Sequence, residues 1–336
     1  MVQKLKGLHD VELQQGRLRY IDIYFGGTCN LSCEYCFTNH QKGRLTTADR
    51  KSLLEQASKL GVKTFVCTGA GEPMMDEGFR EVIQYANSLG MTSVIYTNGN
   101  YITPEMAKFL YENNVSPLIK LESLDPETHD QITNVKGSHQ RAVAGIESLL
   151  SAGYGANENR VARAGIAAVY TALNIGSFSE LKDYCDRIGF LFTADELGLE
   201  KKARENQERL FVGKDKVDEV KKRLGIIESG IGHANYGETT TCRFADYGLR
   251  IDQEGNVSYC TMQDIGRVVG NVLEEGLDRV VYGVRIAKEI AIREKLKTLG
   301  QVNETLLRNG YSIKVRLPSN TCPFKGGDNL VVEDRK

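Results

Sequence analysis

The sequence predicts an α/β fold, an open partial (β/α)6 TIM-like barrel followed by a small C-terminal α+β region. Short runs rich in β-branched and aromatic residues alternate six times with longer amphipathic segments over residues 18–230. Strands that alternate with helices in this way are parallel, and the helices cover the outer face of the sheet. Six units are fewer than the roughly eight of a closed barrel, so we expect the barrel to stay open.

The expected elements follow one another in regular order along the chain. The strands are predicted at residues 18–25, 64–68, 92–97, 118–121, 165–170 and 190–194. The helices are predicted at about 46–61, 76–89, 104–112 and 138–152, then 177–188, with a long charged helical region ending near 224. Thr46 is a plausible cap for the first helix. Functional sites on such sheets lie at the carboxyl ends of the strands, so residues just after each strand are the candidates.

Length and composition set the outer bounds. The 336 residues have room for a large and a small domain, and we divide them into a polar lead-in (1–17), the barrel (18–230) and an auxiliary domain (231–336). A net charge of −1 gives no support for nucleic acid or an anionic membrane as a partner. The sequence has no apolar run long enough for a membrane helix and no signal-peptide core at its start. Eight cysteines in such a chain fit metal ligation in a reducing cytoplasm better than a disulfide framework.

The strongest functional signal is a group of three cysteines directly after the first predicted strand. Cys29, Cys33 and Cys36 stand at the spacing C-x3-C-x2-C within one short loop. Thiolates grouped so closely hold soft metal centres, among them iron–sulfur clusters. Three thiolates on a four-iron cluster leave one iron without a protein ligand. A zinc site would need a second cysteine pair or a Cys/His set, and His40 is the alternative fourth ligand.

This motif and the order of the motifs after it resemble the radical S-adenosylmethionine (SAM) superfamily. In that family three cysteines hold a [4Fe-4S] cluster, and SAM binds the fourth iron through its amino and carboxylate groups. Reductive cleavage then yields methionine and a 5′-deoxyadenosyl radical, which abstracts hydrogen from a substrate. The family often has an aromatic residue before the last cysteine, and Tyr35 occupies that place. The resemblance also implies the partial barrel and a flavodoxin- or ferredoxin-type reductant.

The loop after the second strand resembles the GGE motif that binds the SAM amino group in this family. It reads TGAGEP over residues 68–73, so Gly69, Gly71 and Glu72 match the motif around an inserted Ala70. Glycine lets the backbone approach a ligand closely. The alternative is a plain tight loop with no ligand.

The next two strand ends also resemble family motifs. Thr97 and Asn98 lie in a TNG turn and could hydrogen-bond SAM or merely cap the turn. After the fourth strand, the resemblance implies that Lys120 could pair with the SAM carboxylate and that Ser123 could contact ribose or substrate. The alternative for Lys120 is an ion pair with Glu122 across the strand end.

Three later strand-end residues and two cysteines are weaker candidates. Asn174 follows the fifth strand and is a further SAM candidate, while Asp195 and Glu196 could hold polar substrate groups or cap the next helix. Cys67 and Cys185 lie in an apolar strand and a helix, where a thiol usually packs as a small buried hydrophobe.

The C-terminal region contains three further cysteines. Cys242 and Cys260 flank a predicted hairpin with a glycine-containing turn, and Cys322 follows much later. The order of cysteine, hairpin, cysteine and a helix from about Glu274 resembles the Twitch/SPASM auxiliary domain. That resemblance implies a second [4Fe-4S] cluster held by Cys242, Cys260 and Cys322. The alternative is that these are ordinary buried thiols.

Together these features predict a radical SAM enzyme of the oxidoreductase or lyase type. We expect it to abstract hydrogen from a small polar metabolite such as a sugar, cyclitol or nucleotide, leading to oxidation or rearrangement. A maturase of ribosomal peptides is the alternative. A non-catalytic iron–sulfur electron carrier or redox sensor is the alternative from another class, but it would need neither the glycine motif nor the polar strand ends.

Overall fold

A computed structural model of the chain describes residues 4–7, 18–38, 40, 42–156, 160–199, 201–226, 248–258, 268–281 and 308. Within these ranges, nine strands form one sheet in the order β11-β10-β9-β2-β3-β4-β5-β7-β8. The six predicted barrel strands lie side by side and run parallel. They are β2 (Tyr20–Ile23), β3 (Thr64–Cys67), β4 (Thr92–Thr97), β5 (Val115–Lys120), β7 (Gly165–Val169) and β8 (Leu191–Asp195). The predicted α/β fold with a parallel barrel sheet is therefore confirmed.

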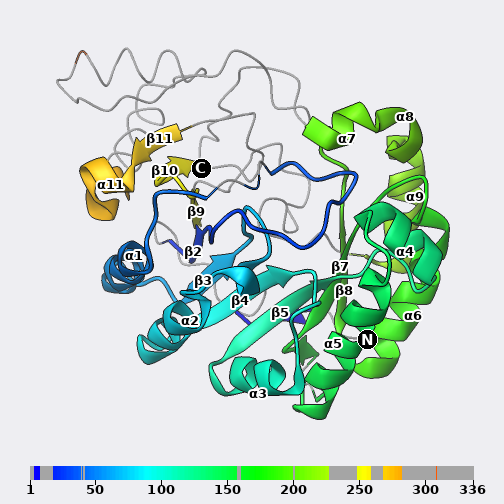
Figure 1. The fold of residues 1–336 in the computed structure, drawn as a ribbon, viewed down its shortest axis with the longest axis horizontal. Coiled ribbons are helices and arrows are strands. Elements are labelled where there is room, and N and C mark those ends of the chain that lie inside the picture. Colours follow the sequence, from blue (N-terminus) through cyan, green and yellow to red (C-terminus); the bar gives the residue numbers. More distant parts are fainter. Residues whose placement is uncertain are drawn as a thin grey trace, which may run out of the picture.

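Helices cover the outer face of this curved sheet (Figure 1). They are α1 (Thr47–Lys59), α2 (Phe79–Ser88), α3 (Pro104–Glu112), α5 (Ser138–Ser151), α6 (Phe178–Ile188) and α9 (Lys214–Leu224). The cap predicted for α1 is present, because Thr46 Oγ1 accepts from Asp49 N at 3.1 Å and Asp49 Oδ2 accepts from Thr46 N at 2.9 Å. This reciprocal pair is a capping box, which satisfies backbone donors that the first turn leaves open.

The structure differs from the predicted helices in two places. A further helix, α4 (Pro126–Thr133), begins after Asp125, whose carboxylate accepts from Thr128 N at 2.8 Å. Asp followed by Pro at the first helical position is a helix-start signal, so this helix was predictable from the sequence. The predicted long helical region ending near 224 is divided into α7 (Lys201–Glu205), α8 (Gln207–Leu210) and α9. Two single-turn 3-10 helices, η1 (Pro73–Met75) and η2 (Ile175–Ser177), follow β3 and β7.

Residues 4–7 lie at the amino ends of the barrel strands. β1 (Lys4–Leu5) pairs in parallel with β6 (Val161–Ala162), and the Gly7 carbonyl accepts from Thr64 Oγ1 at 2.7 Å. Leu5 is fully buried in a cluster of inward-facing side chains from the barrel strands. The apolar side chains of this cluster include Tyr20, Val66, Val94, Leu118, Ala167 and Leu191. A strand of two residues has too little periodicity to be predicted, so the sequence suggested only a polar lead-in.

The C-terminal hairpin joins the barrel sheet directly. β9 (Gly248–Ile251) lies parallel to β2, and β10 (Asn256–Ser258) and β11 (Val268–Asn271) follow it with antiparallel pairing. A short helix, α11 (Val272–Glu275), comes next, close to the predicted helix start. The sheet thus contains strands from both sides of the domain boundary that we placed between residues 230 and 231, and that boundary stays a prediction. Within the described part of the chain, no helix combines the length and apolar character that crossing a bilayer requires.

The contacts of Leu5 lead to a prediction about stability. Replacing a fully buried leucine by alanine removes apolar contacts and leaves a cavity, so Leu5→Ala should lower the free energy of unfolding by about 2–4 kcal/mol. Denaturant unfolding monitored by circular dichroism measures this change. Lys4→Ala is the matched control, because Lys4 is exposed in the same strand. Equal unfolding midpoints for both variants would show that the N-terminal residues are a dispensable lead-in.

Candidate metal centre

The three cysteines lie together in the loop that follows β2 at the carboxyl edge of the sheet. All three are free thiols and are half-buried. The loop turns tightly between the second and third, where Cys36 N donates to the Cys33 carbonyl at 3.1 Å. Leu31 N approaches Cys29 Sγ at 3.4 Å, as a donor to a thiolate would. The loop therefore presents three sulfur atoms from one short stretch of backbone.

The electrostatics of this loop suit a cationic centre. Burial raises the pKa of the Cys33 thiol, and the neighbouring Cys36 and Glu122 raise it further. Burial likewise raises the pKa of Cys29. Thiols in this setting stay neutral unless a positive metal centre stabilises the thiolates. The donor set, three sulfurs and no oxygen, fits an iron–sulfur cluster.

A single metal ion fits the site less well. No three Cys, His, Asp or Glu side chains among the described residues converge on one ion position. In a [4Fe-4S] cluster each thiolate bonds a different iron, so the sulfurs need not meet at one point. His40 lies beside the loop, with Nε2 3.4 Å from Cys36 Sγ and Nδ1 3.1 Å from the Gly27 carbonyl oxygen. Its role as a fourth ligand stays an open alternative.

The glycine-rich loop after β3 lies directly against the cysteine loop. Glu72 N donates to the Thr28 carbonyl at 2.8 Å, next to Cys29 in sequence. A Cβ atom on Gly71 would lie 2.3 Å from that same oxygen and 2.7 Å from the Gly27 carbonyl carbon. Because these neighbours are backbone atoms, no side chain can move aside to make room. Gly71 is therefore required for the two loops to touch.

The Glu72 side chain joins this loop to the end of β4. Its carboxylate accepts hydrogen bonds from Thr97 Oγ1 at 2.8 Å, Asn98 N at 2.8 Å and Met74 N at 3.2 Å. The carboxyl is almost fully buried, and this burial raises its pKa to about 7. A buried carboxylate held by three donors is a fixed negative charge at the strand ends once it is ionised.

The two predicted residues of the β4 turn have different surroundings. Thr97 Oγ1 donates to Glu72 and accepts from Gly99 N at 3.0 Å, so its hydroxyl is used within the turn. Asn98 Nδ2 donates to Asn30 Oδ1 at 2.7 Å and lies 3.9 Å from Cys29 Sγ. Asn98 therefore contacts the cysteine loop directly, while Thr97 shapes the turn.

Lys120, Glu122 and Tyr35 meet at the end of β5. The Tyr35 hydroxyl donates to Glu122 Oε1, and Lys120 Nζ lies 3.6 Å from the same oxygen. Lys120 Nζ also lies 5.6 Å from the centroid of the Tyr35 ring, a distance typical of a cation–π contact. The ion pair considered for Lys120 is thus present, and the lysine also faces the cysteine loop.

The remaining two SAM candidates have local partners. Asn174 is buried, its Oδ1 accepts from Thr171 N at 3.0 Å, and its Nδ2 donates to the Val169 and Glu122 carbonyls at 3.0 Å each. Ser123 Oγ accepts from Asp125 N at 3.1 Å and lies 3.4 Å from Ser177 Oγ. Both side chains shape the strand ends in this structure.

The other sequence candidates are placed as follows. Cys67 and Cys185 are buried in the core between sheet and helices, where we expected them. Glu196 pairs with Lys221 at 2.7 Å. Cys242, Cys260 and Cys322, predicted to hold the second cluster, lie outside the described residues.

Sequence reasoning did not select two buried carboxylates of this region. The sequence predicts Glu122 only as an ion-pair partner of Lys120. Its carboxylate also accepts hydrogen bonds from the Tyr35 hydroxyl and from Val169 N at the end of β7. Asp22 faces into the barrel and accepts from Thr68 N at 3.1 Å and Thr68 Oγ1 at 2.7 Å, with Arg250 Nε at 3.9 Å. Burial raises the pKa of Asp22 to about 6. The signal for Asp22 was present, since a carboxylate within an apolar strand is unusual.

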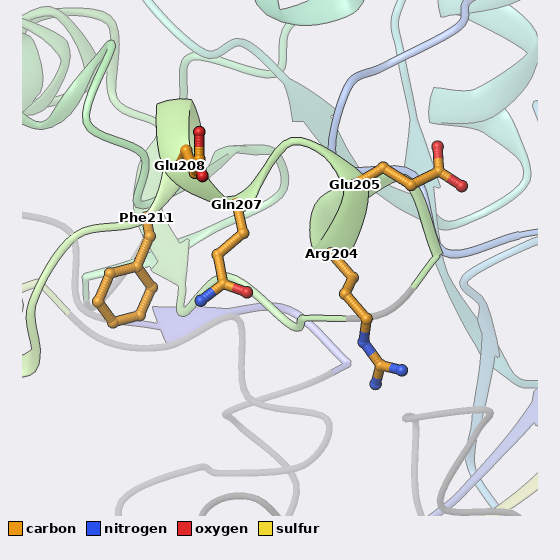
Figure 2. A pocket seen from close by; sticks show the side chains of 5 residues that line it. All are labelled: Arg204, Glu205, Gln207, Glu208 and Phe211. Carbon is orange, nitrogen blue, oxygen red and sulfur yellow. The ribbon is translucent and has the colours of Figure 1, made fainter.

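The far side of the cysteine loop is held by the segment after β8. Lys202 Nζ donates to Ser32 Oγ at 2.8 Å, Asn206 Nδ2 donates to the Glu34 carbonyl at 2.9 Å, and Arg209 pairs with the Glu34 carboxylate. Beside these contacts, an open pocket on α7 and α8 is lined by Arg204, Glu205, Gln207, Glu208 and Phe211 (Figure 2). This pocket contains none of the three cysteines, so we do not assign the metal centre to it.

Comparisons with known proteins agree with this geometry. Residues 23–162 match the family described as the radical SAM superfamily. An AdoMet-dependent heme synthase of Oleidesulfovibrio alaskensis is 30% identical over 167 residues, covering 48% of this chain and 41% of the relative. A mycofactocin maturase, MftC, of Mycobacterium ulcerans is 30% identical over 165 residues, covering 48% and 40%. The chain thus spans about two fifths of the length of these curated relatives.

Solved structures show the same fold at lower identity. Streptococcus suis SuiB bound to its precursor peptide SuiA aligns with a TM-score of 0.61 and 20% identity, covering 80% of this chain and 65% of SuiB. The protein anSMEcpe bound to AdoMet and a peptide aligns with a TM-score of 0.59 and 16% identity, covering 79% and 80%. At this identity the likeness shows the fold alone.

The close approach at Gly71 leads to a prediction. Gly71→Ala should separate the glycine-rich loop from the cysteine loop, because the added methyl group meets backbone atoms, and the strain should cost about 1–3 kcal/mol. Iron content after anaerobic reconstitution and the thermal unfolding midpoint should both fall. Gly176→Ala is the matched control, since nothing lies within 4 Å of the added Cβ there. A Gly71→Ala protein with full iron content would contradict the proposed packing of the two loops.

Proposed function

We propose that the chain is an enzyme that cleaves SAM reductively and abstracts hydrogen from a substrate, since residues 23–162 match the radical SAM superfamily. One observation supports this proposal above the others. The three-cysteine loop contacts the glycine-rich loop and the ends of β4 and β5, so the thiols and the candidate SAM contacts share one edge of the sheet. An electron carrier would need the thiols alone.

The metal centre in this proposal is a [4Fe-4S] cluster held by Cys29, Cys33 and Cys36. When bound, the cluster supplies one electron to the sulfonium of SAM, whose C–S bond breaks to methionine and a 5′-deoxyadenosyl radical. The chain's own residues position and shield the reactants. Burial at the mouth of the barrel excludes water, which protects a radical from side reactions.

SAM binding is assigned to the polar groups beside the loop. The backbone of Gly69 and Gly71, with the Glu72 carboxylate, receives the amino group, because an ionised carboxylate accepts strong hydrogen bonds from the N–H groups of an amine. Lys120 receives the SAM carboxylate, as its ammonium faces the cysteine loop.

The remaining assigned residues contact the nucleoside or position other groups. Asn98 and Ser123 are the contacts for the nucleoside part, and the Tyr35 ring lines the site. Thr97 and Asn174 have all their polar atoms in local hydrogen bonds, so we propose positioning roles for them.

Two further components complete the proposal. A flavodoxin- or ferredoxin-type protein supplies the electron. Residues 231–336 form a Twitch/SPASM-like region in which Cys242, Cys260 and Cys322 hold a second [4Fe-4S] cluster. The hairpin β9–β10 supports this part, because it follows the order expected for such a region and lies beside β2, which leads into the cysteine loop.

For the substrate we propose a small polar metabolite such as a sugar, cyclitol or nucleotide. Polar side chains inside the barrel support it, since buried Asp22 on β2 contacts the half-buried Thr68 and the buried Arg250. Buried polar groups of this kind orient polar ligands in enzyme sites.

A ribosomal-peptide maturase is the second candidate. The observations that favour it are the relative named mycofactocin maturase and the fold shared with SuiB, which was solved with its precursor peptide. Mass spectrometry of candidate substrates after incubation with the reduced chain and SAM separates the two. Loss of hydrogen from a peptide would support the maturase. Conversion of a sugar, cyclitol or nucleotide would support the proposal of a small polar metabolite.

The cysteines provide the test of the proposed function. Cys29, Cys33 and Cys36 replaced together by alanine should abolish 5′-deoxyadenosine formation, since no cluster remains to supply the electron. Iron should fall from about eight to about four per chain, because each [4Fe-4S] cluster holds four. Liquid chromatography and iron analysis measure both. A triple variant that still forms 5′-deoxyadenosine at the parent rate would refute the assignment, and a parent with only four irons would remove the second cluster.

The raised pKa of Glu72 predicts a pH dependence of SAM binding. The carboxyl has a pKa of about 7 in the folded chain, against its usual value of 4.5, so it is mostly protonated at pH 6 and mostly ionised at pH 8. Only the ionised form is an acceptor at both oxygens for the N–H groups of the SAM amine, so SAM affinity should rise between pH 6 and pH 8. Anaerobic calorimetry measures this change.

Two controls accompany the pH experiment. Glu72→Gln should bind SAM weakly and lose the pH dependence over this range. Without SAM, the stability of the fold should change with pH in the opposite direction. A raised carboxyl pKa stabilises the fold fully below pH 4.5, and this contribution is lost as pH rises through about 7. SAM affinity that is flat or falling across this range would contradict the role of Glu72.

A further inference from the structure

A side-chain network at the barrel mouth places two opposite charges beside the middle of the cysteine loop. Tyr35 stands between Cys33 and Cys36, and its hydroxyl donates to Glu122 Oε1. Lys120 Nζ lies 3.6 Å from that oxygen and 5.6 Å from the centroid of the Tyr35 ring. One carboxylate and one ammonium therefore lie beside Tyr35, one of the two residues between Cys33 and Cys36.

The Glu122 carboxylate is held rigidly. Its Oε2 accepts from Val169 N at 2.9 Å, with Asn174 Nδ2 at 3.4 Å. Its own backbone N–H donates to His129 Nδ1 at 3.1 Å. One oxygen is thus anchored to the β7 end, which leaves the other directed at the cysteine loop. The two oxygens cannot exchange places without breaking these bonds.

The two charges are also poorly screened. The Glu122 side chain is fully buried, and that of Lys120 is only 23% exposed. Solvent and salt screen buried charges far less than exposed ones, so each acts on its surroundings over several ångströms. The fields of the two side chains have opposite signs at Cys33.

We propose that Glu122 and Lys120 are an opposing charge pair that sets the reduction potential of the cluster held by Cys29, Cys33 and Cys36. Reduction adds one electron from an external donor to the cluster. A fixed negative charge nearby opposes that addition and a positive charge favours it, so Glu122 lowers the potential and Lys120 raises it. Local charge is one of the factors that set iron–sulfur potentials. This proposal rests on the proposed function, because it requires the cluster.

The test is a redox titration of the full chain, reconstituted anaerobically and followed by electron paramagnetic resonance. The signal that changes when SAM is added identifies the cluster at this loop, and its midpoint potential is then measured without SAM. Glu122→Gln should raise the midpoint potential, and Lys120→Met should lower it. The double variant should lie closer to the parent than either single variant.

Controls separate the effect of charge from a general disturbance of the loop. Tyr35→Phe removes the hydrogen bond to Glu122 but keeps both charges, so its potential should stay closer to the parent than that of either charge variant. Glu81→Gln and Lys51→Met make the same substitutions in a surface ion pair of 2.7 Å and should shift nothing. Iron content and thermal unfolding are measured for every variant.

Opposite shifts support the proposal, since damage to the loop would move both variants in one direction. Shifts in the same direction, or no shift in Glu122→Gln at parent iron content, would overturn it. If Glu122→Gln fails to bind iron, the potential of Lys120→Met decides alone. Lys120 is partly exposed, so its replacement should leave the fold and the iron content intact. A potential that stays or rises in Lys120→Met then overturns the proposal. A parent chain without a SAM-responsive signal would overturn the proposed function as well.

Discussion

The site depends on the contact between two loops, where the backbone at Gly71 and Glu72 lies against the backbone at Gly27 and Thr28. The hydrogen bond from Glu72 N to the Thr28 carbonyl, at 2.8 Å, fixes the start of the cysteine loop. A side chain at position 71 would push the loops apart. From this contact the Glu72 side chain extends to β4, so hydrogen bonds connect the ends of β2, β3 and β4. The cysteine loop therefore takes its position from the sheet.

Two buried carboxylates organise opposite sides of the loop. Glu72 fixes the side next to β3 and β4, and Glu122 reaches Tyr35 from β5 while β7 holds it in place. Buried carboxylates are costly unless hydrogen-bonded, and each of these has several partners. Their charges are consequently fixed in place, which suits the proposed binding of an amino group and of a metal centre.

The sequence predicted the regular parts of this molecule well, because each barrel strand and its helix carry their own periodicity. The β4 and α3 ranges, for example, match the prediction. Features that depend on distant residues were missed. Two residues of β1 carry no periodicity, and their role appears only when β6 lies beside them.

In the site, too, features set by neighbouring residues were predicted, and contacts between residues far apart in the sequence were not. Cys29, Cys33 and Cys36 were selected by spacing alone. The contacts that Glu122 makes with several segments could not be predicted, because its partners Tyr35 and Val169 lie 87 and 47 residues away in the sequence. The central claim is that the cysteine loop holds a cluster whose open iron binds SAM. The most direct measurement is electron–nuclear double resonance on the reduced full chain with SAM labelled with ¹⁵N in its amino group. The account predicts a ¹⁵N hyperfine coupling that is lost in the triple cysteine variant. A reduced cluster with no such coupling at saturating SAM would contradict it.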